Sequence, residues 1–384
     1  MQPGRDATVT YERTSRLSFR ANSRYHTQDL IDSCGAAVAM TILALAGIPL
    51  DEMSQEVELA NAKNAGKGTK FSMSPTAVVD LLNIKLEAIG KKERYQALYV
   101  DCPKACLRSS LVSARAGWPA VTLLWGYHWG LIDGYETDVS GKVVTAVWLH
   151  NPVENLPDGD GLPPHCSTDL CGSGGALGCA EELLVSSIWL DDYSWECEQL
   201  KKECGSYYVS IGVPAPLPPA EFEARTEPPS VSQQALASGL IEAAAEVFVE
   251  YETSLRQTHV GESIEVVPLD DRIAPYSLAA LNTAEGRIFW IQTRGDDRTP
   301  LAVAKESTPQ PPVVTVEEAR LVAQALIPGA LAGEVSSSFV WRLCPESYSP
   351  FLPFRKVRMS EGESVYVRSD GKGFLSLTEP ILGG

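Results

Sequence analysis

This sequence has no long hydrophobic run, no excess of basic residues and no recognisable leader, and each absence excludes a class of protein. No apolar stretch reaches the roughly 20 residues that a membrane-spanning helix needs. Acidic residues outnumber basic ones by 49 to 32, a net charge of −17, so a basic face for nucleic acid is not expected. The polar N-terminus at 1–6 lacks the charged-then-apolar layout of a signal peptide. We therefore expect a cytoplasmic protein with no membrane and no nucleic-acid partner.

The cysteines lack the spacings of the common zinc and redox motifs. Cys34 is accompanied by Cys102, Cys106, Cys166, Cys171, Cys179, Cys197, Cys204 and Cys344. None of these forms a Cys-x2-Cys pair, as zinc knuckles and thioredoxin motifs do. Eight further cysteines permit four disulfides, which would indicate secretion. We rank partial disulfides first, buried free thiols second and structural zinc third, and we expect no metal or cofactor at the functional site.

The chain has 384 residues, room for two or three domains, and its prolines indicate where they divide. The Pro-rich segment 215–229 predicts a stiff, extended linker. Residues 1–19 are polar and without pattern, which predicts a loose N-terminal arm or a first edge strand. The two regions beside the linker, 20–214 and 230–384, mix helical and strand patterns. The predicted fold class is therefore α+β, with the smaller region at the C-terminus.

The strongest element is an apolar helix from Cys34 to about Ala46. Ser33 is a suitable N-cap, and Gly47 and Pro49 would end the helix. Because nearly every side chain in it is apolar, this helix should run through the centre of its domain. Further helices are expected at 51–63, 75–82 and 107–116, and strands at 119–125, 129–135 and 143–150.

Four residues in this region have the chemistry of nucleophilic catalysis. Cys34 opens the apolar helix, and a helix N-terminus with a nearby imidazolium favours the reactive thiolate. His128 opens one predicted strand and Asn151 follows the next, so antiparallel pairing would bring the base and its orienting carboxamide together. Gln28, six residues before Cys34, would form an oxyanion hole with the Cys34 backbone N–H.

Each of these residues also has a plainer interpretation. Cys34 could be a buried free cysteine, because cysteine behaves as a small hydrophobe. His128 could be a core histidine among its aromatic neighbours, and Asn151, which precedes a proline, could start a turn. His150 should point to the opposite face of its strand, and His26 is a weaker alternative base. The four residues in combination favour catalysis.

Four segments in the same order resemble the papain-like cysteine peptidases that process double-glycine leaders of bacteriocins. They are Gln28-x5-Cys34-Gly35, Gly117-Trp-Pro119-Ala-Val121, His128-Trp-Gly-Leu-Ile-Asp-Gly134-Tyr135 and Leu149-His-Asn151-Pro152. The resemblance covers about 20–214, where 186–195 and 206–213 fit the last helix region and the final strand of the family. It implies a papain-like fold with an oxyanion-hole Gln28, nucleophile Cys34, base His128 and orienting Asn151.

The chain also departs from this family. Many members have Asp where this chain has Asn151, and Ala36 stands where Pro is usual. A Cys-rich acidic insertion is predicted at 153–205, and no transporter domain is fused, so bacteriocin export is not implied. The stretch 151–200 has ten acidic and no basic residues, which would favour cationic substrates beside a cleft; a solvated acidic loop is the plainer alternative.

Residues 230–384 contain a faint repeat with an offset of 75 to 76 residues. Capping-box sequences at Ser230 and Thr315 predict one helix in each of two units, 230–308 and 309–384. Each unit should pack its helix on a short antiparallel sheet. The pattern resembles PepSY-type or cystatin-like modules, and this resemblance implies binding to a partner protein or restraint of a peptidase.

The sequence thus predicts a cysteine peptidase that hydrolyses peptide or protein substrates through a thioester. The resemblance implies a preference for Gly-Gly or other small residues. Two other classes stay open: a deamidase, acyltransferase or toxin-like effector that uses the same residues, and a catalytically silent binding protein. The presence of all four site residues argues against the silent protein.

Overall fold

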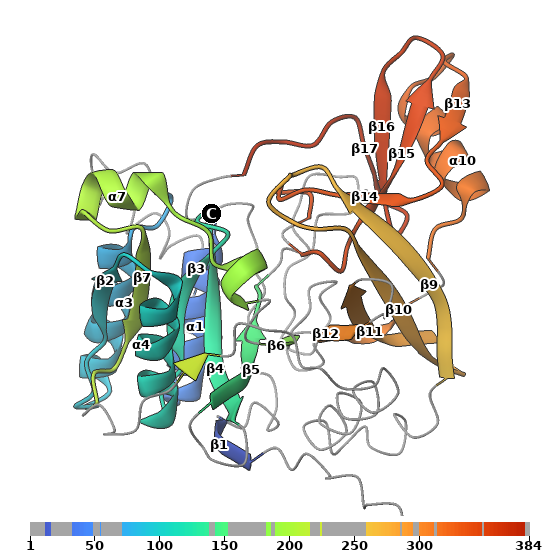
Figure 1. Ribbon diagram of the computed structural model, residues 1–384. Helices are drawn as coiled ribbons and strands as arrows, with labels where there is room; N and C mark the ends of the chain where they lie inside the picture. The colour runs from blue at the N-terminus through green and yellow to red at the C-terminus, as the bar shows by residue number, and fades with distance from the viewer. Residues whose placement is uncertain are drawn as a thin grey trace, which may run out of the picture.

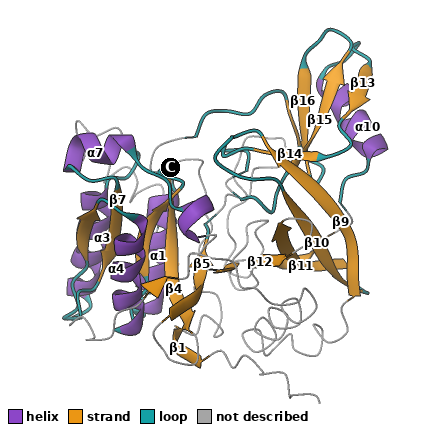
Figure 2. Ribbon diagram, viewed as in Figure 1, coloured by secondary structure: helices purple, strands orange, loops and turns teal. Residues whose placement is uncertain are grey.

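The computed structural model describes residues 12–16, 33–48, 54, 71–137, 143–152, 182–185, 189–215, 223–224, 259–284, 286–294, 299–310, 313–347 and 349–380. These residues form a mixed α+β protein, as predicted (Figures 1 and 2). Helices gather around the sheet of the N-terminal region, whereas the C-terminal region is mostly strands. None of the helices described in these ranges is long and apolar enough to cross a membrane.

The N-terminal region is built on an antiparallel sheet in the strand order β2-β7-β3-β4-β5. Its strands are β2 Gln96–Val100, β3 Ala120–Leu124, β4 His128–Thr137, β5 Val143–His150 and β7 Tyr208–Gly212. Two short strands extend it: β1 Glu12–Arg16 pairs with β4, and β8 Glu223–Ala224 runs parallel to β5. The strands predicted at 119–125, 129–135, 143–150 and 206–213 are confirmed, and β2 is an addition.

Helices cover both faces of this sheet. One buried cluster joins α1 Cys34–Leu45 and α3 Pro75–Ala88 to side chains of β3 and β4 such as Val121 and Leu131. On the other face, α4 Pro103–Arg115 packs against Leu124 and Ile132, which lie an odd number of positions from Val121 and Leu131. This alternation follows from the two-residue period of a strand, in which successive side chains point to opposite faces.

The predicted helix at Cys34 is confirmed, although its start differs in detail. Ser33 occupies the N-cap position, but its side chain does not make the capping hydrogen bond. The helix ends before Gly47, whose φ of +101° suits a residue without Cβ. All but one of the residues in α1 are buried, as its apolar composition predicts.

Two other helices begin or end outside their predicted bounds. α3 reaches Ala88 rather than residue 82, and the Ser74 hydroxyl caps its start by accepting the Ala77 N–H at 3.2 Å. α4 begins at Pro103 rather than residue 107, because the Cys102 sulfur occupies the N-cap position and accepts the Ala105 N–H at 3.4 Å. The helix predicted at 51–63 lies almost wholly outside the described residues, and of the segment 1–19 the structure describes the edge strand β1.

The C-terminal region contains two groups of strands. β9 His259–Pro268, β10 Tyr276–Thr283, β11 Gly286–Arg294 and β12 Thr299–Gln310 form an antiparallel meander. The second group comprises α10 Val316–Leu326, β13 Ala332–Val335, β14 Phe339–Trp341, β15 Phe354–Met359, β16 Ser364–Arg368 and β17 Gly373–Phe374. β14 joins the groups by pairing in parallel with β9.

The predicted repeat has structural support in two hairpins. β10 pairs with β11, and β15 pairs with β16, at corresponding positions of the repeat. Gly286 and Gly362, 76 residues apart, both have positive φ at the turn, +137° and +88°. The capping box at Thr315 is confirmed, whereas the one predicted at Ser230 lies outside the described residues.

The two regions share one sheet and one core. β6 Glu182–Val185 pairs with β5 on one side and with β12 on the other. The same buried cluster contains Trp125 and Tyr193 of the N-terminal region and Trp290 and Trp341 of the C-terminal region. Part of the predicted insertion at 153–205 is thus a structural link between the regions, and most of its remainder up to residue 188 lies outside the described residues.

Candidate catalytic site

His128 and Asn151 meet at the end of the N-terminal sheet, as their positions in the sequence predict. His128 is the first residue of β4, and Asn151 directly follows the last residue of β5. The register pairs Leu131 with His150, which brings the two chain ends to the same edge. The His128 Nε2 and the Asn151 Oδ1 lie 2.8 Å apart, within hydrogen-bond distance.

This hydrogen bond selects the form of the imidazole. A carboxamide oxygen only accepts, so the ring carries its proton on Nε2 and donates it to Asn151. The neutral ring then has its lone pair on Nδ1, which is the nitrogen able to take a proton from a nucleophile. Asn151 therefore has the geometry of an orienting residue for a general base.

Cys34 lies beside the same end of β4. Its Sγ accepts a hydrogen bond from the backbone N–H of Trp129, the residue after His128, at 3.2 Å. The Trp129 indole is fixed in turn, because its Nε1–H donates to the Met73 carbonyl at 2.9 Å. The sulfur therefore sits at the N-terminus of α1, where the helix dipole and a backbone donor both favour negative charge.

Gly35 allows this close approach of helix and strand. A Cβ atom at Gly35 would lie 2.9 Å from the Met73 Cβ and 3.0 Å from the Trp129 Cδ1. Both distances are shorter than ordinary van der Waals contact, so a larger residue would push α1 away from β4. The Cys-Gly dipeptide of the sequence motif thus has a packing role at the site.

Aromatic side chains cover the His128 ring. Trp125 stacks on it, with ring centroids 6.4 Å apart and an angle of 29° between the planes. Tyr193, from the π-helix η2 Trp189–Tyr193, lies 4.8 Å from Trp125, and its carbonyl accepts the Trp125 N–H at 2.6 Å. The predicted last helix region at 186–195 is therefore a single π-turn, and π-turns are frequent at functional sites.

All three site residues are inaccessible to solvent. Cys34, His128 and Asn151 are each 0% exposed. Burial alone fits a structural cysteine as well as a nucleophile, and Cys106 is an example of the former. Its Sγ contacts the Thr122 hydroxyl at 3.4 Å and the Val209 carbonyl at 3.3 Å, and burial raises the pKa of its thiol to about 11. The nearby His–Asn pair distinguishes Cys34 from this background.

Of His150, His26 and Gln28, the structure describes His150. His150 is buried and pairs across the sheet with Leu131, a member of the cluster that contains α1, whereas Asn151 bonds His128. Gln28 and His26 lie outside the described residues, so the oxyanion-hole role of Gln28 stays a prediction.

The partial disulfides ranked first from the sequence are not found among the described cysteines, which fit the second-ranked alternative of free thiols. Cys34, Cys102, Cys106, Cys197, Cys204 and Cys344 are not in disulfides, and Cys166, Cys171 and Cys179 lie outside the described residues. The physical reason is that several thiols have other roles. Cys102 and Cys197 each cap a helix, with Cys197 accepting the Leu200 N–H at 3.4 Å at the start of α7 Glu198–Cys204. In the described part of the chain, no group of three or more potential ligands is placed to hold a metal ion.

Sequence reasoning missed three contributors to the site. The Trp129 backbone N–H faces the sulfur, Trp125 covers the imidazole and Tyr193 holds Trp125. A backbone donor has no signature in residue type, and aromatic residues beside His128 are equally consistent with a core. The chain matches no protein-family model, no curated protein and no solved structure in comparisons with each of these.

Proposed function

We propose that this chain is a cysteine peptidase in which Cys34 is the nucleophile, His128 the base and Asn151 the residue that orients it. The observation that carries the proposal is the 2.8 Å contact between His128 Nε2 and Asn151 Oδ1. The next residue, Trp129, donates its backbone N–H to the Cys34 sulfur. A buried structural histidine also needs a hydrogen-bond partner, so it is the position of the pair next to the Cys34 site that favours the role of base.

A papain-like fold is part of this proposal. Its support is a helix with a cysteine at its N-terminus, packed on an antiparallel sheet that supplies histidine and then asparagine. The order of the three residues along the chain and the strand ends that carry His128 and Asn151 support this part of the proposal. The wider α+β class is independent of this assignment.

The proposed reaction proceeds through a thioester. The Cys34 thiol gives its proton to His128, and the sulfur attacks the carbonyl carbon of the scissile amide. As the carbon–nitrogen bond breaks, His128 returns the proton to the leaving amine. Water, deprotonated by His128, then attacks the thioester, releasing a carboxylic acid and restoring the thiol. The first N–H groups of α1 point out of the helix and are suited to stabilise the oxyanion.

Because Cys34 is fully buried, substrate must reach the sulfur through a rearrangement of the residues around it. The acidic balance of the chain favours cationic peptides in the approach to the protein. A Gly-Gly or other small-residue preference remains part of the proposal through the family resemblance.

Mass spectrometry of the protein after reaction with a thiol-directed peptide electrophile tests the proposal. Cys102 and Cys204 are exposed, so their serine variants provide a background with less unselective labelling. We expect modification at Cys34 that is lost in Cys34→Ala, falls strongly in His128→Ala and is partly retained in Asn151→Ala. Cys106 is the internal control, since it is also buried and its Sγ contacts the Thr122 hydroxyl and the Val209 carbonyl.

Selective labelling of Cys34 over Cys106 that depends on His128 would establish an activated thiolate. Labelling of Cys34 only after unfolding, at the same rate as Cys106, would identify it as a structural cysteine and overturn the proposal.

A further inference from the structure

We propose that the C-terminal region positions the base of this site: Trp341 and Arg294 hold Trp125 against the His128 ring, so that the reactivity of Cys34 depends on residues more than 150 positions away. This inference rests on the proposed function for its consequence in catalysis. Its structural part concerns the orientation of His128 and can be measured without any substrate.

The backbone of Trp125 adopts a left-handed conformation. Its φ of +54° makes it the one described residue other than glycine with a positive φ. A bulky residue pays a conformational cost in this region, and such strain persists only where neighbouring contacts fix the conformation. Here the fixed conformation places the indole on the imidazole of His128.

One of those contacts comes from the C-terminal region. The Trp341 ring, on β14, packs against Trp125 with centroids 6.0 Å apart and an angle of 54°. Trp341 is itself fixed, because its Nε1–H donates to the Ser347 hydroxyl at 3.3 Å and its carbonyl accepts the Leu269 N–H at 2.7 Å. The aromatic series from Trp341 through Trp125 to His128 is fully buried.

A second contact fixes the π-helix that holds Trp125. Arg294, on β11, forms an ion pair and hydrogen bond with Asp192, the residue before Tyr193. Burial raises the pKa of Asp192, and the Arg294 charge opposes this effect. The pair therefore links the C-terminal meander to the turn whose Tyr193 carbonyl accepts the Trp125 N–H. Two independent contacts of the C-terminal region thus act on Trp125: Trp341 packs against its ring, and Arg294 acts through η2.

The physical consequence is restricted rotation of His128. An aromatic ring stacked on an imidazole keeps water from its face and limits the ring to orientations that preserve the Nε2–Asn151 hydrogen bond. Without the stack, the His128 ring would keep the orientation set by its hydrogen bond to Asn151 for a smaller fraction of the time. A misplacement of this kind lowers rates by about 10-fold to 100-fold in catalytic sites.

The test measures alkylation of Cys34 by iodoacetamide as a function of pH, read by peptide mass spectrometry, in the full chain. Trp341→Ala removes the supporting ring, Trp341→Phe keeps an aromatic ring, and Arg294→Gln breaks the link to Asp192. Phe374→Ala and Arg342→Gln are the matched controls. They remove an aromatic contact with Phe354 and an ion pair with Glu379 in the same region, neither of which touches Trp125.

We expect Trp341→Ala to slow Cys34 alkylation by on the order of 10-fold and to move the midpoint of its pH profile upward. The sign follows from a weaker thiolate–imidazolium pair, which raises the pKa of the thiol. Arg294→Gln should act in the same direction, Trp341→Phe should restore most of the rate, and the controls should match the parent protein. If Trp341→Ala does not fold, Trp341→Phe and Arg294→Gln still decide between the outcomes.

Nitrogen NMR of labelled histidine gives a readout independent of reactivity. We expect the Nε2–H tautomer of His128 in the parent protein and averaging of the two tautomers in Arg294→Gln and Trp341→Ala. An unchanged tautomer with unchanged alkylation would overturn the inference, as would faster alkylation, which would show that the C-terminal region only covers the site. A changed tautomer with no His128-dependent labelling in the parent would refute the proposed function while supporting the positioning.

Discussion

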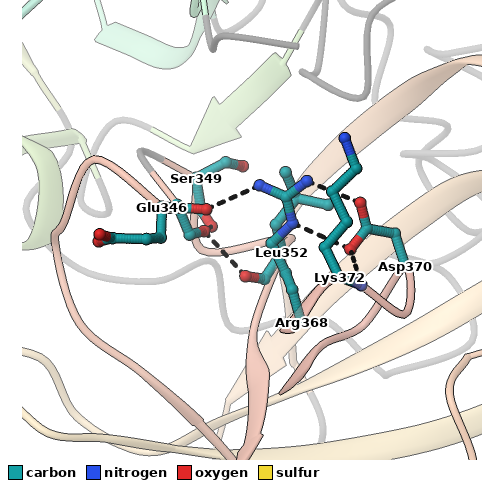
Figure 3. A network of polar contacts seen from close by, with 7 residues as sticks. Glu346, Ser349, Leu352, Arg368, Asp370 and Lys372 are labelled. Atoms are coloured by element: carbon teal, nitrogen blue, oxygen red, sulfur yellow. Dashed lines mark hydrogen bonds and ion pairs between the residues drawn. The ribbon is translucent and has the colours of Figure 1, made fainter. Parts of the chain in front are cut away.

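At the scale of single residues, Arg368 is a buried cation of the C-terminal region. The Arg368 side chain is 0% exposed and donates from Nε and Nη2 to the two oxygens of Asp370 at 3.0 and 2.6 Å (Figure 3). Its Nη1 donates to the Glu346 carbonyl at 2.7 Å. A planar guanidinium satisfies this carboxylate with two parallel bonds, which a lysine ammonium would not reproduce. Neither residue of this pair was singled out from the sequence.

The Arg368–Asp370 pair predicts acid sensitivity. Burial by itself raises the pKa of Asp370, but the Arg368 charge and the hydrogen bonds from Arg368 and the Lys372 N–H outweigh it, so the pKa lies below its ordinary value. The stabilisation is therefore fully present above the unfolded pKa of about 3.9 and lost as the pH falls through the folded pKa. Asp370→Asn should destabilise by about 3–5 kcal/mol at pH 7, because it leaves a buried cation unpaired.

Thermal unfolding between pH 2 and pH 7 measures this effect. The difference in Tm between parent and Asp370→Asn should narrow below about pH 3.9. Glu379→Gln is the control, since the Glu379 side chain is 84% exposed and its pair with Arg342 should contribute about 0–1 kcal/mol. A constant difference in Tm across the range would contradict the assigned titration.

At the scale of elements, local capping chemistry predicted some boundaries and missed others. The Thr315 hydroxyl accepts the Glu318 N–H at 3.2 Å, and the Glu318 carboxylate accepts the Thr315 N–H at 2.8 Å, which is the capping box that the sequence indicated. The starts of α4 and α7 were missed because their caps are cysteines, which are not among the usual capping residues. β2 was missed because its residues are half exposed and follow no clear alternation.

Thr315→Ala should lower the free energy of unfolding by about 1 kcal/mol through loss of the cap on α10. The helix is short and packs its buried face through Ala319 and Ala323, so the cap is a large part of its local stability. Urea unfolding of Thr315→Ala and of the neighbouring Glu317→Gln, which leaves the capping box intact, measures the difference. Equal stability of the two variants would argue against a stabilising cap in solution.

At the scale of the whole molecule, the shared sheet predicts cooperative unfolding. Because β6 pairs with both β5 and β12 and one buried cluster spans both regions, neither region can unfold without exposing the core of the other. We expect a single calorimetric transition with coincident loss of far-UV circular dichroism and tryptophan fluorescence.

Two separated transitions would indicate independently stable domains on either side of 215–229.

Leu184 is a fully buried residue of β6, the strand that pairs with β5 and β12. Leu184→Asp should lower the temperature of the whole transition, because it buries a charge in the shared core. A substitution that affected only part of the unfolding signal would contradict the shared core.

The sequence by itself determined the α+β class, the apolar helix at Cys34, the strands that carry His128 and Asn151, and the capping of α10. These features depend on local periodicity, capping chemistry and chain order, all of which act over a few residues. Only the tertiary structure decided that the Trp129 N–H faces the Cys34 sulfur, that Trp341 supports Trp125, and that β6 joins the two regions. Such contacts depend on how distant segments pack, and many arrangements of the same local elements would satisfy the sequence pattern equally well.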